Sequence, residues 1–368
     1  MFVEQVWLEQ YRNIQTACIQ PARHLTVLYG SNGQGKTNFL ESVYLLGNAR
    51  PFRSVKLPDL ISHGNRTAAV RGTVFSAGVQ SDIVLRLEQH TRRVTVDGKG
   101  IQRAADLHGR LAVVIFSPDD TAMVKLGPET RRRYLDRSLY ASDAGFLQDY
   151  HSYYRILKQR NALLKTNQLE GLDLWTEQLA EAGSRLMDHR QRYADRLNHL
   201  LQQKYQQIAG EQEKVALVYQ PDLPCTAEDD RAEIVRTVLN NQREQDLRYK
   251  TTGRGPHRDD LTFLIGGRPL KGFGSQGQQR SFVLALKMAE LDHLQETFGE
   301  MPVLLLDDIA SELDRERMKN LLSYVRQREV QVLITTTDVT PFLPVLQQDS
   351  KLFRVEEGRL TYEGNGTP

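Results

Sequence analysis

The sequence has only two cysteines, Cys18 and Cys225, and they form no Cys-x-x-Cys pair. Disulfide frameworks and structural zinc sites need cysteines in larger or more closely spaced sets. We therefore expect neither kind of site, and the cysteine content is typical of a protein in a reducing compartment.

Long apolar runs are also missing. No stretch approaches the roughly eighteen apolar residues of a membrane-spanning helix. The start of the chain carries an acid at Glu4 and lacks the basic segment and apolar run of a signal peptide. We expect a cytoplasmic protein with no membrane contact.

The chain has little excess charge of either sign. Its net charge is +2, although charged residues make up 26% of its 368 residues. A balance so close to neutral does not by itself indicate a nucleic-acid partner, so any DNA contact must come from local basic patches.

The character of the chain changes twice along its length. Residues 1–117 mix short β-like runs, such as 68–74 and 82–87, with a helical pattern after residue 37. Glycine and proline become scarce between about 129 and 214, where apolar residues recur at helical spacing. The α/β texture returns near 251. We predict an α/β domain built from 1–117 and 251–368, interrupted by an α-helical lobe at 118–250.

Residues 30–37 match the phosphate-binding pattern G-x-x-x-x-G-K-[ST]. The matching residues are Gly30, Ser31, Asn32, Gly33, Gln34, Gly35, Lys36 and Thr37. Glycines let backbone N–H groups point at phosphate oxygens, and the following helix adds its positive end. Lys36 would reach the β- and γ-phosphates of ATP, and the Thr37 hydroxyl would hold Mg²⁺.

An apolar run at 303–306 ends in two acids, Asp307 and Asp308. A buried strand that ends this way can place Asp307 beside the metal. Asp308 would then accept a proton from the attacking water. Without the glycine loop, a core strand with an acidic turn would explain the run equally well.

A glycine-rich segment at 273–280 precedes the acidic strand. Ser275 can cap the helix that follows, and the N–H groups around Gly277 and Gln278 can form a second anion site. One phosphate-binding loop does not need a second site, whereas a head-to-tail homodimer would use both. The alternative is a plain helix cap.

Five segments together carry a family resemblance: 30–38 (GSNGQGKTN), 116–120 (FSPDD), 127–136 (GPETRRRYLD), 255–260 (GPHRDD) and 274–278 (GSQGQ). With the paired acids, they resemble the ATP-binding-cassette (ABC) heads of the SMC and DNA-repair ATPases, and within that group the RecF family. The resemblance covers nearly the whole chain.

The resemblance implies an ABC-type ATPase head that dimerises around ATP, clamps DNA and releases it on hydrolysis. It implies that Ser275 contacts the γ-phosphate of ATP bound to the other copy. It also implies work with RecO and RecR in loading RecA at single-strand gaps, in DNA replication and in the SOS response. Asp308 stands where many cassettes have glutamate, so we expect slow hydrolysis. The residues equivalent to the lid glutamine and the sensor histidine are not identified.

Basic residues of the predicted lobe are the candidates for DNA contact. They are Arg131, Arg132, Arg133, Arg155, Lys158, Arg160 and Lys165. Because acids are interleaved with them, a solvated helix face is an equally good interpretation. His257 has no second ligand at metal-binding spacing, so we expect a structural or interfacial role for it and not metal binding.

Two other functions remain open at this point. A transporter ATPase subunit would have its loop and acidic strand closer together than Thr37 and Asp307 are here. A P-loop kinase of small molecules would leave the Ser275 segment unexplained. A membrane-bound partner would favour the first, and a phosphorylated metabolite the second.

Overall fold

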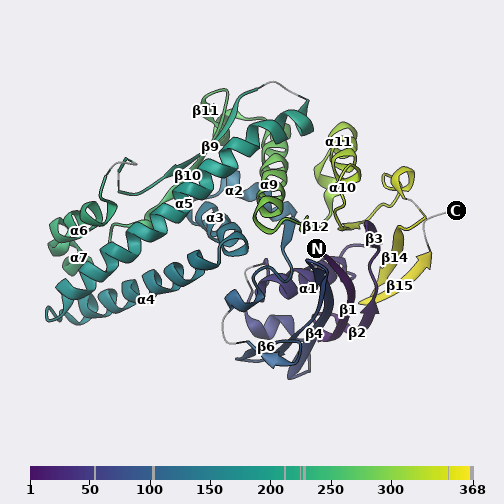
Figure 1. Ribbon diagram of the computed structural model, residues 1–368, viewed down its shortest axis with the longest axis horizontal. Helices are drawn as coiled ribbons and strands as arrows, with labels where there is room; N and C mark the ends of the chain where they lie inside the picture. The colour runs from purple at the N-terminus through teal and green to yellow at the C-terminus, as the bar shows by residue number, and fades with distance from the viewer. Residues whose placement is uncertain are drawn as a thin grey trace. The chain divides into compact units, whose positions relative to one another are not determined.

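The computed structural model describes residues 1–53, 55–101, 104–210, 213–223, 225–226, 229–346 and 348–364 (Figure 1). The chain folds into two compact units. The first comprises Met1–Thr121, Lys204–Glu211 and Gln276–Pro368, and the second comprises Ala122–Gln203 and Gln212–Ser275. Among the described residues, no helix combines the length and the apolar character needed to cross a membrane.

A mainly parallel sheet forms the centre of the first unit. Its strand order is β15-β14-β3-β13-β12-β8, and only β15 runs antiparallel to its neighbour. The strands are β3 (Leu25–Tyr29), β8 (Val113–Phe116), β12 (Val303–Leu306), β13 (Val332–Thr336), β14 (Lys351–Glu356) and β15 (Arg359–Gly364). Every residue of β8, β12 and β13 is buried, as expected for parallel strands covered on both faces.

An antiparallel sheet is the second layer of this unit. Its order is β2-β1-β4-β5-β6-β7. The strands are β1 (Phe2–Tyr11), β2 (Ile14–Ile19), β4 (Thr67–Ser76), β5 (Val79–Glu88), β6 (Arg92–Val96) and β7 (Lys99–Gly100). Asp97 and Gly98 both have positive φ, at 51° and 76°, as the predicted hairpin turn requires.

Helix α1 (Lys36–Asn48) supplies the core between the two sheets. Its residues Phe39, Val43 and Leu46 belong to one buried cluster with side chains from β1, β4, β5, β3 and β12. A Cβ at position 72 would lie 2.3 Å from Leu46 Cδ1, so Gly72 allows α1 to approach β4 closely. The helix predicted after residue 37 is confirmed.

The first unit contains several further helices. They are η1 (Leu57–Leu60), η2 (Ala104–Leu107), α9 (Gln276–Phe298), α10 (Ile309–Glu312), α11 (Arg315–Arg326) and η4 (Leu343–Val345), and α2 (Pro118–Lys125) begins here. The last turns of α5 (Leu172–Ala209) also belong to this unit. They are joined to α9 by an ion pair in which Lys204 Nζ lies 2.5 Å from Asp292 Oδ2.

The second unit contains the long helices predicted for the lobe. They are α3 (Pro128–Ser142), α4 (Ala144–Thr166) and most of α5, followed by α6 (Arg231–Asn241) and α7 (Arg243–Tyr249). The predicted break in the first helix, near 141–145, is confirmed at Asp143, which caps α4 by accepting from Gly145 N and Phe146 N. The turn predicted at 166–173 joins α4 to α5.

The same unit also holds a three-stranded sheet that the sequence analysis did not predict. Its order is β11-β10-β9, with β9 (Val215–Gln220), β10 (Asp260–Ile265) and β11 (Arg268–Pro269), and η3 (Pro256–Arg258) and α8 (Leu270–Phe273) flank it. Strand β9 falls within 118–250, so that segment is not purely helical.

The borders of the compact units differ from the predicted domain limits. Residues 251–275 group with the helical unit because β10 pairs with β9, and 204–211 group with the two large sheets. The domain limits at 117/118 and 250/251 stay a prediction.

Candidate nucleotide-binding site

The loop at 30–37 connects β3 to α1, which begins at Lys36. Gly30, Gly33 and Gly35 have φ values of 152°, 79° and 113°, a region that side chains with a Cβ rarely adopt. A Cβ at position 30 would lie 2.3 Å from the carbonyl oxygen of Val355. The strand, glycine loop and helix predicted from the sequence are therefore all present.

Two distant turns hold this loop in place. Asn13, in the turn between β1 and β2, donates to the carbonyl of Gln34 at 3.0 Å. In the turn between β14 and β15, Gly358 N donates to the same carbonyl at 2.9 Å, and Glu357 N donates to Gln34 Oε1 at 2.6 Å. The backbone carbonyl and the side chain of Gln34 thus anchor the loop to these two turns, so the side chain has a structural role.

Lys36 folds back over its own loop. Its ammonium donates to the carbonyls of Gly30, at 2.6 Å, and Ser31, at 2.8 Å. Burial lowers the pKa of Lys36 from its ordinary value, and the nearby Asp308 and Asp307 oppose that change. The ammonium therefore lies at the glycine loop and lines the same pocket as Arg53.

Asp307 joins three segments of the chain. Its Oδ1 accepts hydrogen bonds of 2.7 Å from the hydroxyls of Thr37 and Thr335, and Arg53 Nη2 lies 3.8 Å from its Oδ2. Burial raises the pKa of Asp307 above its ordinary value, although the two hydroxyl donors favour the ionised form. The predicted proximity of Thr37 and Asp307 is present.

Asp308 adopts an unusual backbone conformation, with a φ of 49°. Its Oδ2 accepts from Ser311 Oγ at 2.9 Å, and its N–H donates to Thr335 Oγ1 at 3.0 Å. Its Oδ1 is buried and has no hydrogen-bond partner among the described residues. A buried acceptor without a donor is costly and points to an absent ligand or water.

A polar pocket of about 310 Å³ lies in front of these groups. The lining includes these predicted residues: Asn32, Gly33, Gly35, Lys36, Thr37, Asp307 and Asp308. It also includes residues to which the sequence analysis gave no role at this site: Asn38, Arg53, Ser117, Pro118 and Asp119. Thr335, near the end of β13, lines it too. The 116–120 segment reaches the pocket because β8 pairs with β12, with Phe116 opposite Leu306.

The segment around Ser275 is separate from this lining. Ser275 is exposed and stands immediately before α9, whereas Gly277 and Gln278 lie in its first turn. Below that turn, Arg317 Nε donates to Ser281 Oγ at 2.5 Å. Arg317 thereby links α9 to α11, the helix that follows the two acids.

The structure separates the basic DNA candidates into two groups. Arg131 makes two bonds to Asp260, at 2.7 and 2.9 Å, and Arg132 donates to the carbonyl of Asp259. Arg160 is fully buried and bonded to Asp246 at 2.7 Å, so it is no longer a candidate for DNA contact, and it does not lie on a solvated face either. Arg133 pairs with Glu129 on the surface.

Three candidates remain exposed on one side of α4: Arg155, Lys158 and Lys165. Their spacing of three and seven residues places them on one helix face. The only acid in α4 is Asp149, which is bonded to His189 and Arg185.

His257 has the structural role expected of it. Its Nδ1 lies 2.7 Å from the hydroxyl of the buried Tyr153, and its Nε2 lies 3.0 Å from the carbonyl oxygen of Thr252. Burial lowers the pKa of His257 to about 4, so the imidazole is neutral at physiological pH.

Comparisons with known proteins agree on one family. The model of the RecF/RecN/SMC N-terminal domain matches residues 2–360. The chain is 84% identical, over the full length of both proteins, to the DNA replication and repair protein RecF of Trichlorobacter lovleyi. It is 46% identical to RecF of Geobacter metallireducens, with 98% of this chain and all of that protein covered.

Solved structures agree with this result. The structure of the recombination mediator protein RecF-ATP in the RecFOR pathway matches with a TM-score of 0.89 and 30% identity, covering 98% of this chain and 99% of that one. An SMC head bound to the C-terminal winged-helix domain of ScpA matches with a TM-score of 0.56 at 14% identity, which shows a shared ABC-type ATPase head fold. These relatives give no support to a transporter subunit or a small-molecule kinase. The chain belongs to the RecF family of DNA replication and repair proteins.

Proposed function

We propose that this chain binds ATP with Mg²⁺ at the loop of residues 30–37 and uses the bound nucleotide to control its grip on DNA. The observation that carries the proposal is the joining of Thr37 to Asp307 at the mouth of a glycine loop that also carries Lys36. A hydroxyl and a carboxylate are the hard oxygen donors that Mg²⁺ prefers, so these residues fit the metal. When bound, Mg²⁺ would neutralise phosphate charge.

Asp308 is the proposed acceptor of the proton of the attacking water. Among the described residues its buried Oδ1 has no donor, while Ser311 orients the carboxylate through Oδ2. A carboxylate that is held at one oxygen and keeps the other oxygen unbonded suits this role. Aspartate is one methylene shorter than glutamate, which supports slow turnover and a switch-like use of hydrolysis.

Dimerisation around ATP is the proposed consequence of binding. Ser275 is exposed at the start of α9, where the first N–H groups of the helix can meet an anion. A second copy would therefore complete the nucleotide site with its own Ser275. Hydrolysis would then remove the γ-phosphate that both copies grip and release the clamp.

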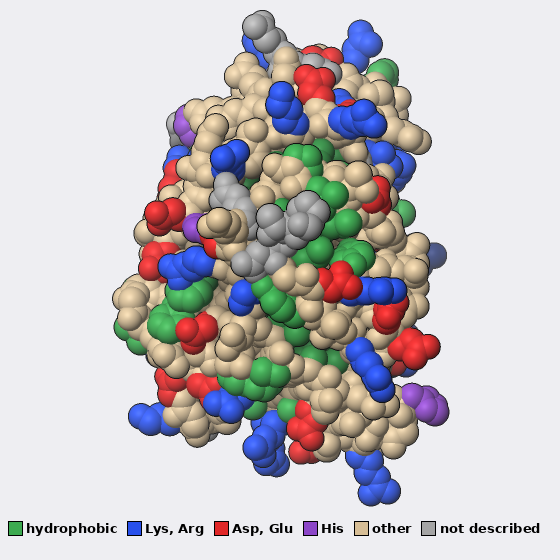
Figure 2. Space-filling view, turned by 90° about the vertical axis from the view of Figure 1, so that its right-hand side faces the viewer, with side chains coloured by type: hydrophobic (Ala, Val, Ile, Leu, Met, Phe, Trp, Pro, Cys, Tyr) green, Lys and Arg blue, Asp and Glu red, His purple; other side chains and the backbone are tan. Residues whose placement is uncertain are grey.

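DNA, RecO and RecR are the proposed partners, in gap repair that helps to load RecA, in replication and in the SOS response. The names of the relatives support DNA replication, DNA repair and the link to RecO and RecR, whereas RecA loading at gaps and the SOS response rest on the family resemblance. The face drawn in Figure 2 carries Lys and Arg interspersed with Asp and Glu and has no extended basic area. The small net charge of +2 likewise favours DNA contact through local groups, and Arg155, Lys158 and Lys165 on α4 are the candidates in the second unit.

The deciding experiment is sedimentation velocity with and without ATP and gapped DNA, repeated across salt concentrations. We expect an ATP-dependent dimer that retains DNA, with retention falling steeply as salt rises. Lys36→Ala should abolish both the dimer and the retention. Ser275→Arg should leave ATP binding intact and block the dimer. ATP-dependent dimers that persist in Ser275→Arg would refute the shared site.

A further inference from the structure

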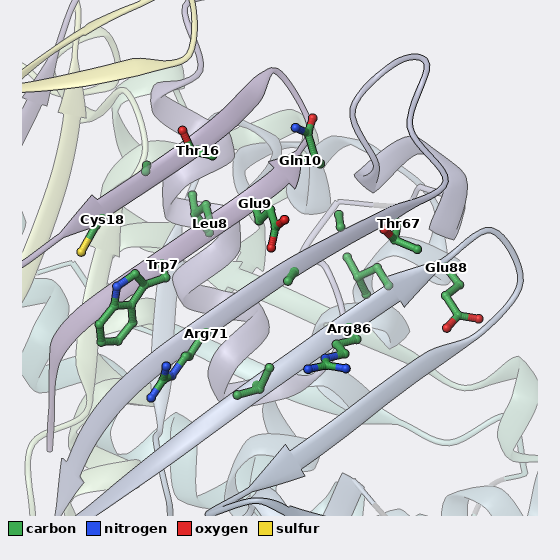
Figure 3. Close-up of a pocket in the computed structure, with 15 residues that line it drawn as sticks. Trp7, Leu8, Glu9, Gln10, Thr16, Cys18, Thr67, Arg71, Arg86 and Glu88 are labelled. Carbon is green, nitrogen blue, oxygen red and sulfur yellow. The ribbon is translucent and has the colours of Figure 1, made fainter.

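The outer face of the antiparallel sheet is hollowed, on the side turned away from α1 (Figure 3). The hollow has a volume of about 840 Å³ and spans β2, β1, β4 and β5. The nucleotide site uses none of its lining residues, which leaves the face without an assigned role.

Strand register arranges the outward side chains in two rows. One row runs Cys18, Trp7, Arg71, Val84 and Thr95 across five strands, and the next runs Thr16, Glu9, Ala69, Arg86 and Arg93. Small side chains, Ala69 and Val84, occupy the middle. The hollow follows from these small residues being flanked by long ones.

Trp7 provides a flat aromatic surface on this face. The structure shows its indole face-on in Figure 3, with the Arg71 guanidinium 4.8 Å from the ring centre. Asp82 holds Arg71 through two hydrogen bonds, at 2.8 and 3.1 Å. The indole is only partly buried and Arg71 lies over its ring, so a planar group could stack on this pair of indole and guanidinium.

Arg86 and Arg93 form a pair of positive charges on this face. They lie directly opposite each other on β5 and β6, and both are exposed. Within the described part of the chain, neither has an ion pair with a carboxylate. Like charges at directly opposed positions destabilise a sheet. An anion between the two guanidinium groups would relieve that repulsion.

Acids at the margins limit the path that an anion can follow. Glu9 is in the same row as Arg86, with Ala69 between them. Glu88 lies at the end of β5, where it accepts a hydrogen bond from Thr91. A polyanion would therefore cross the centre of the face, between Trp7 and the arginine pair. The arginine pair lies two to three strand spacings from Trp7, on the order of 10–14 Å, a span of a few nucleotides.

We infer that this face binds a short segment of single-stranded nucleic acid, with a base stacked on Trp7 and phosphates between Arg86 and Arg93. An aromatic platform beside guanidinium groups is the arrangement that recognises unpaired bases, whereas a duplex keeps its base faces hidden. The inference rests on the proposed DNA partner and adds to it a specific surface on the first unit.

The test uses the full chain with Trp175→Phe, which leaves Trp7 as its only tryptophan because the sequence contains two. Titration with a fluorescein-labelled dT12 oligonucleotide, in the absence of ATP, gives the affinity from anisotropy. Unlabelled dT12 should quench the Trp7 emission as a base stacks on the indole.

The double variant Arg86→Glu/Arg93→Glu should bind dT12 at least tenfold more weakly. The slope of log affinity against log salt should fall by about 1.4, since each lost phosphate contact on a single strand accounts for about 0.7. Lys99→Glu is the control at the edge of the same sheet. Lys99 lies directly opposite the inward-facing Val96, and directly opposed residues share a face, so Lys99 is not on the outer face with Arg86 and Arg93. Its affinity should match that of the parent, and thermal melting should confirm that each variant folds.

Three results would overturn the inference, in distinguishable ways. Affinity of the double variant within twofold of the parent would show that this face does not hold the strand. Equal losses for dT12 and for a duplex would show general charge attraction. A parent protein that binds neither single strands nor duplex would count against the DNA partner of the proposed function as well.

Discussion

Thr37 and Asp307 are separated by 270 residues in the chain, yet the Thr37 hydroxyl donates a hydrogen bond of 2.7 Å to the Asp307 carboxylate. Thr335 donates to the same oxygen. Three strands that neighbour one another in the parallel sheet, β3, β13 and β12, lead to these residues at their carboxyl ends. The edge where a parallel sheet presents its carboxyl ends is the usual place for a ligand.

Asp307→Asn should weaken the binding of ATP with Mg²⁺ and at the same time stabilise the fold. Burial raises the pKa of Asp307, so keeping it ionised at neutral pH costs stability, and the neutral amide still accepts from Thr37 and Thr335. We expect the melting temperature to rise by about 1–3 °C. Mg²⁺-dependent ATP affinity should fall at least tenfold by calorimetry. Asp338→Asn, at the end of the neighbouring strand β13, is the control and should leave affinity unchanged.

Asp308→Asn should slow hydrolysis and spare binding. Removal of a general base typically costs about 10²–10⁴-fold in rate. Single-turnover hydrolysis and equilibrium ATP binding, measured on the same variant, would show a lower rate at an unchanged ATP affinity. The ATP-bound dimer should accumulate in this variant. A rate within threefold of the parent would remove Asp308 from the proposed mechanism.

Arg190 is a fully buried cation of the second unit, and its loss should destabilise that unit strongly. It is bonded to Asp136 at 2.9 and 3.0 Å and to Asp259 at 2.8 Å. Arg190→Met would leave both carboxylates buried without their cation, at a cost of about 3–5 kcal/mol. Urea unfolding followed by circular dichroism measures this. Arg185→Met removes an ion pair with Asp149 on an exposed arginine and should cost under about 1 kcal/mol.

His189 should make the stability of the second unit depend on pH. Its two ring nitrogens lie 2.8 Å from Asp143 and 3.1 Å from Asp149, and the hydrogen bond with Asp143 is the main cause of the raised pKa of His189. A group with a raised folded-state pKa contributes most below its unfolded pKa of about 6.5, and that contribution is lost as pH rises through the folded-state value.

The difference in free energy of unfolding between the parent and His189→Gln should therefore keep the same sign across this pH range but change in size. We expect the variant to be less stable by about 1–2 kcal/mol at pH 5.5, with the difference shrinking toward pH 8.5. Asp143 has its pKa lowered to about 2, chiefly by the His189 hydrogen bond, so it stays ionised over this range. A pH-independent difference would mean that His189 acts through packing against Phe146.

The nucleotide loop could be predicted from sequence because its requirements are local. Glycines with positive φ, a preceding strand and a following helix all lie within a few turns of Lys36. Asp307 was also predictable, since an apolar run ending in acids has one natural placement in a parallel sheet. The position of Arg53 was not, because its approach to Asp307 depends on the fold of the loop after α1.

The basic segments show the opposite limit. Arg131 and Arg160 have the sequence pattern of a solvated face, but their acidic partners, Asp260 and Asp246, are 129 and 86 residues away. Only the tertiary fold reveals such pairs. Strand β9 did have a local signal, because residues 215–220 (VALVYQ) combine β-branched and aromatic side chains, which strands favour.

The support of the nucleotide loop by the turn at Glu357 and Gly358 has a consequence for protein synthesis. Strand β3 lies between β13 and β14, and Gly358 N bonds to Gln34 O. These neighbours leave the ribosome about 300 residues or more after the loop itself, a delay of roughly 15–60 s at common elongation rates. A nascent chain would therefore display its phosphate-binding motif long before the motif has its shape. Nucleotide capture is then among the last properties that a newly made molecule acquires.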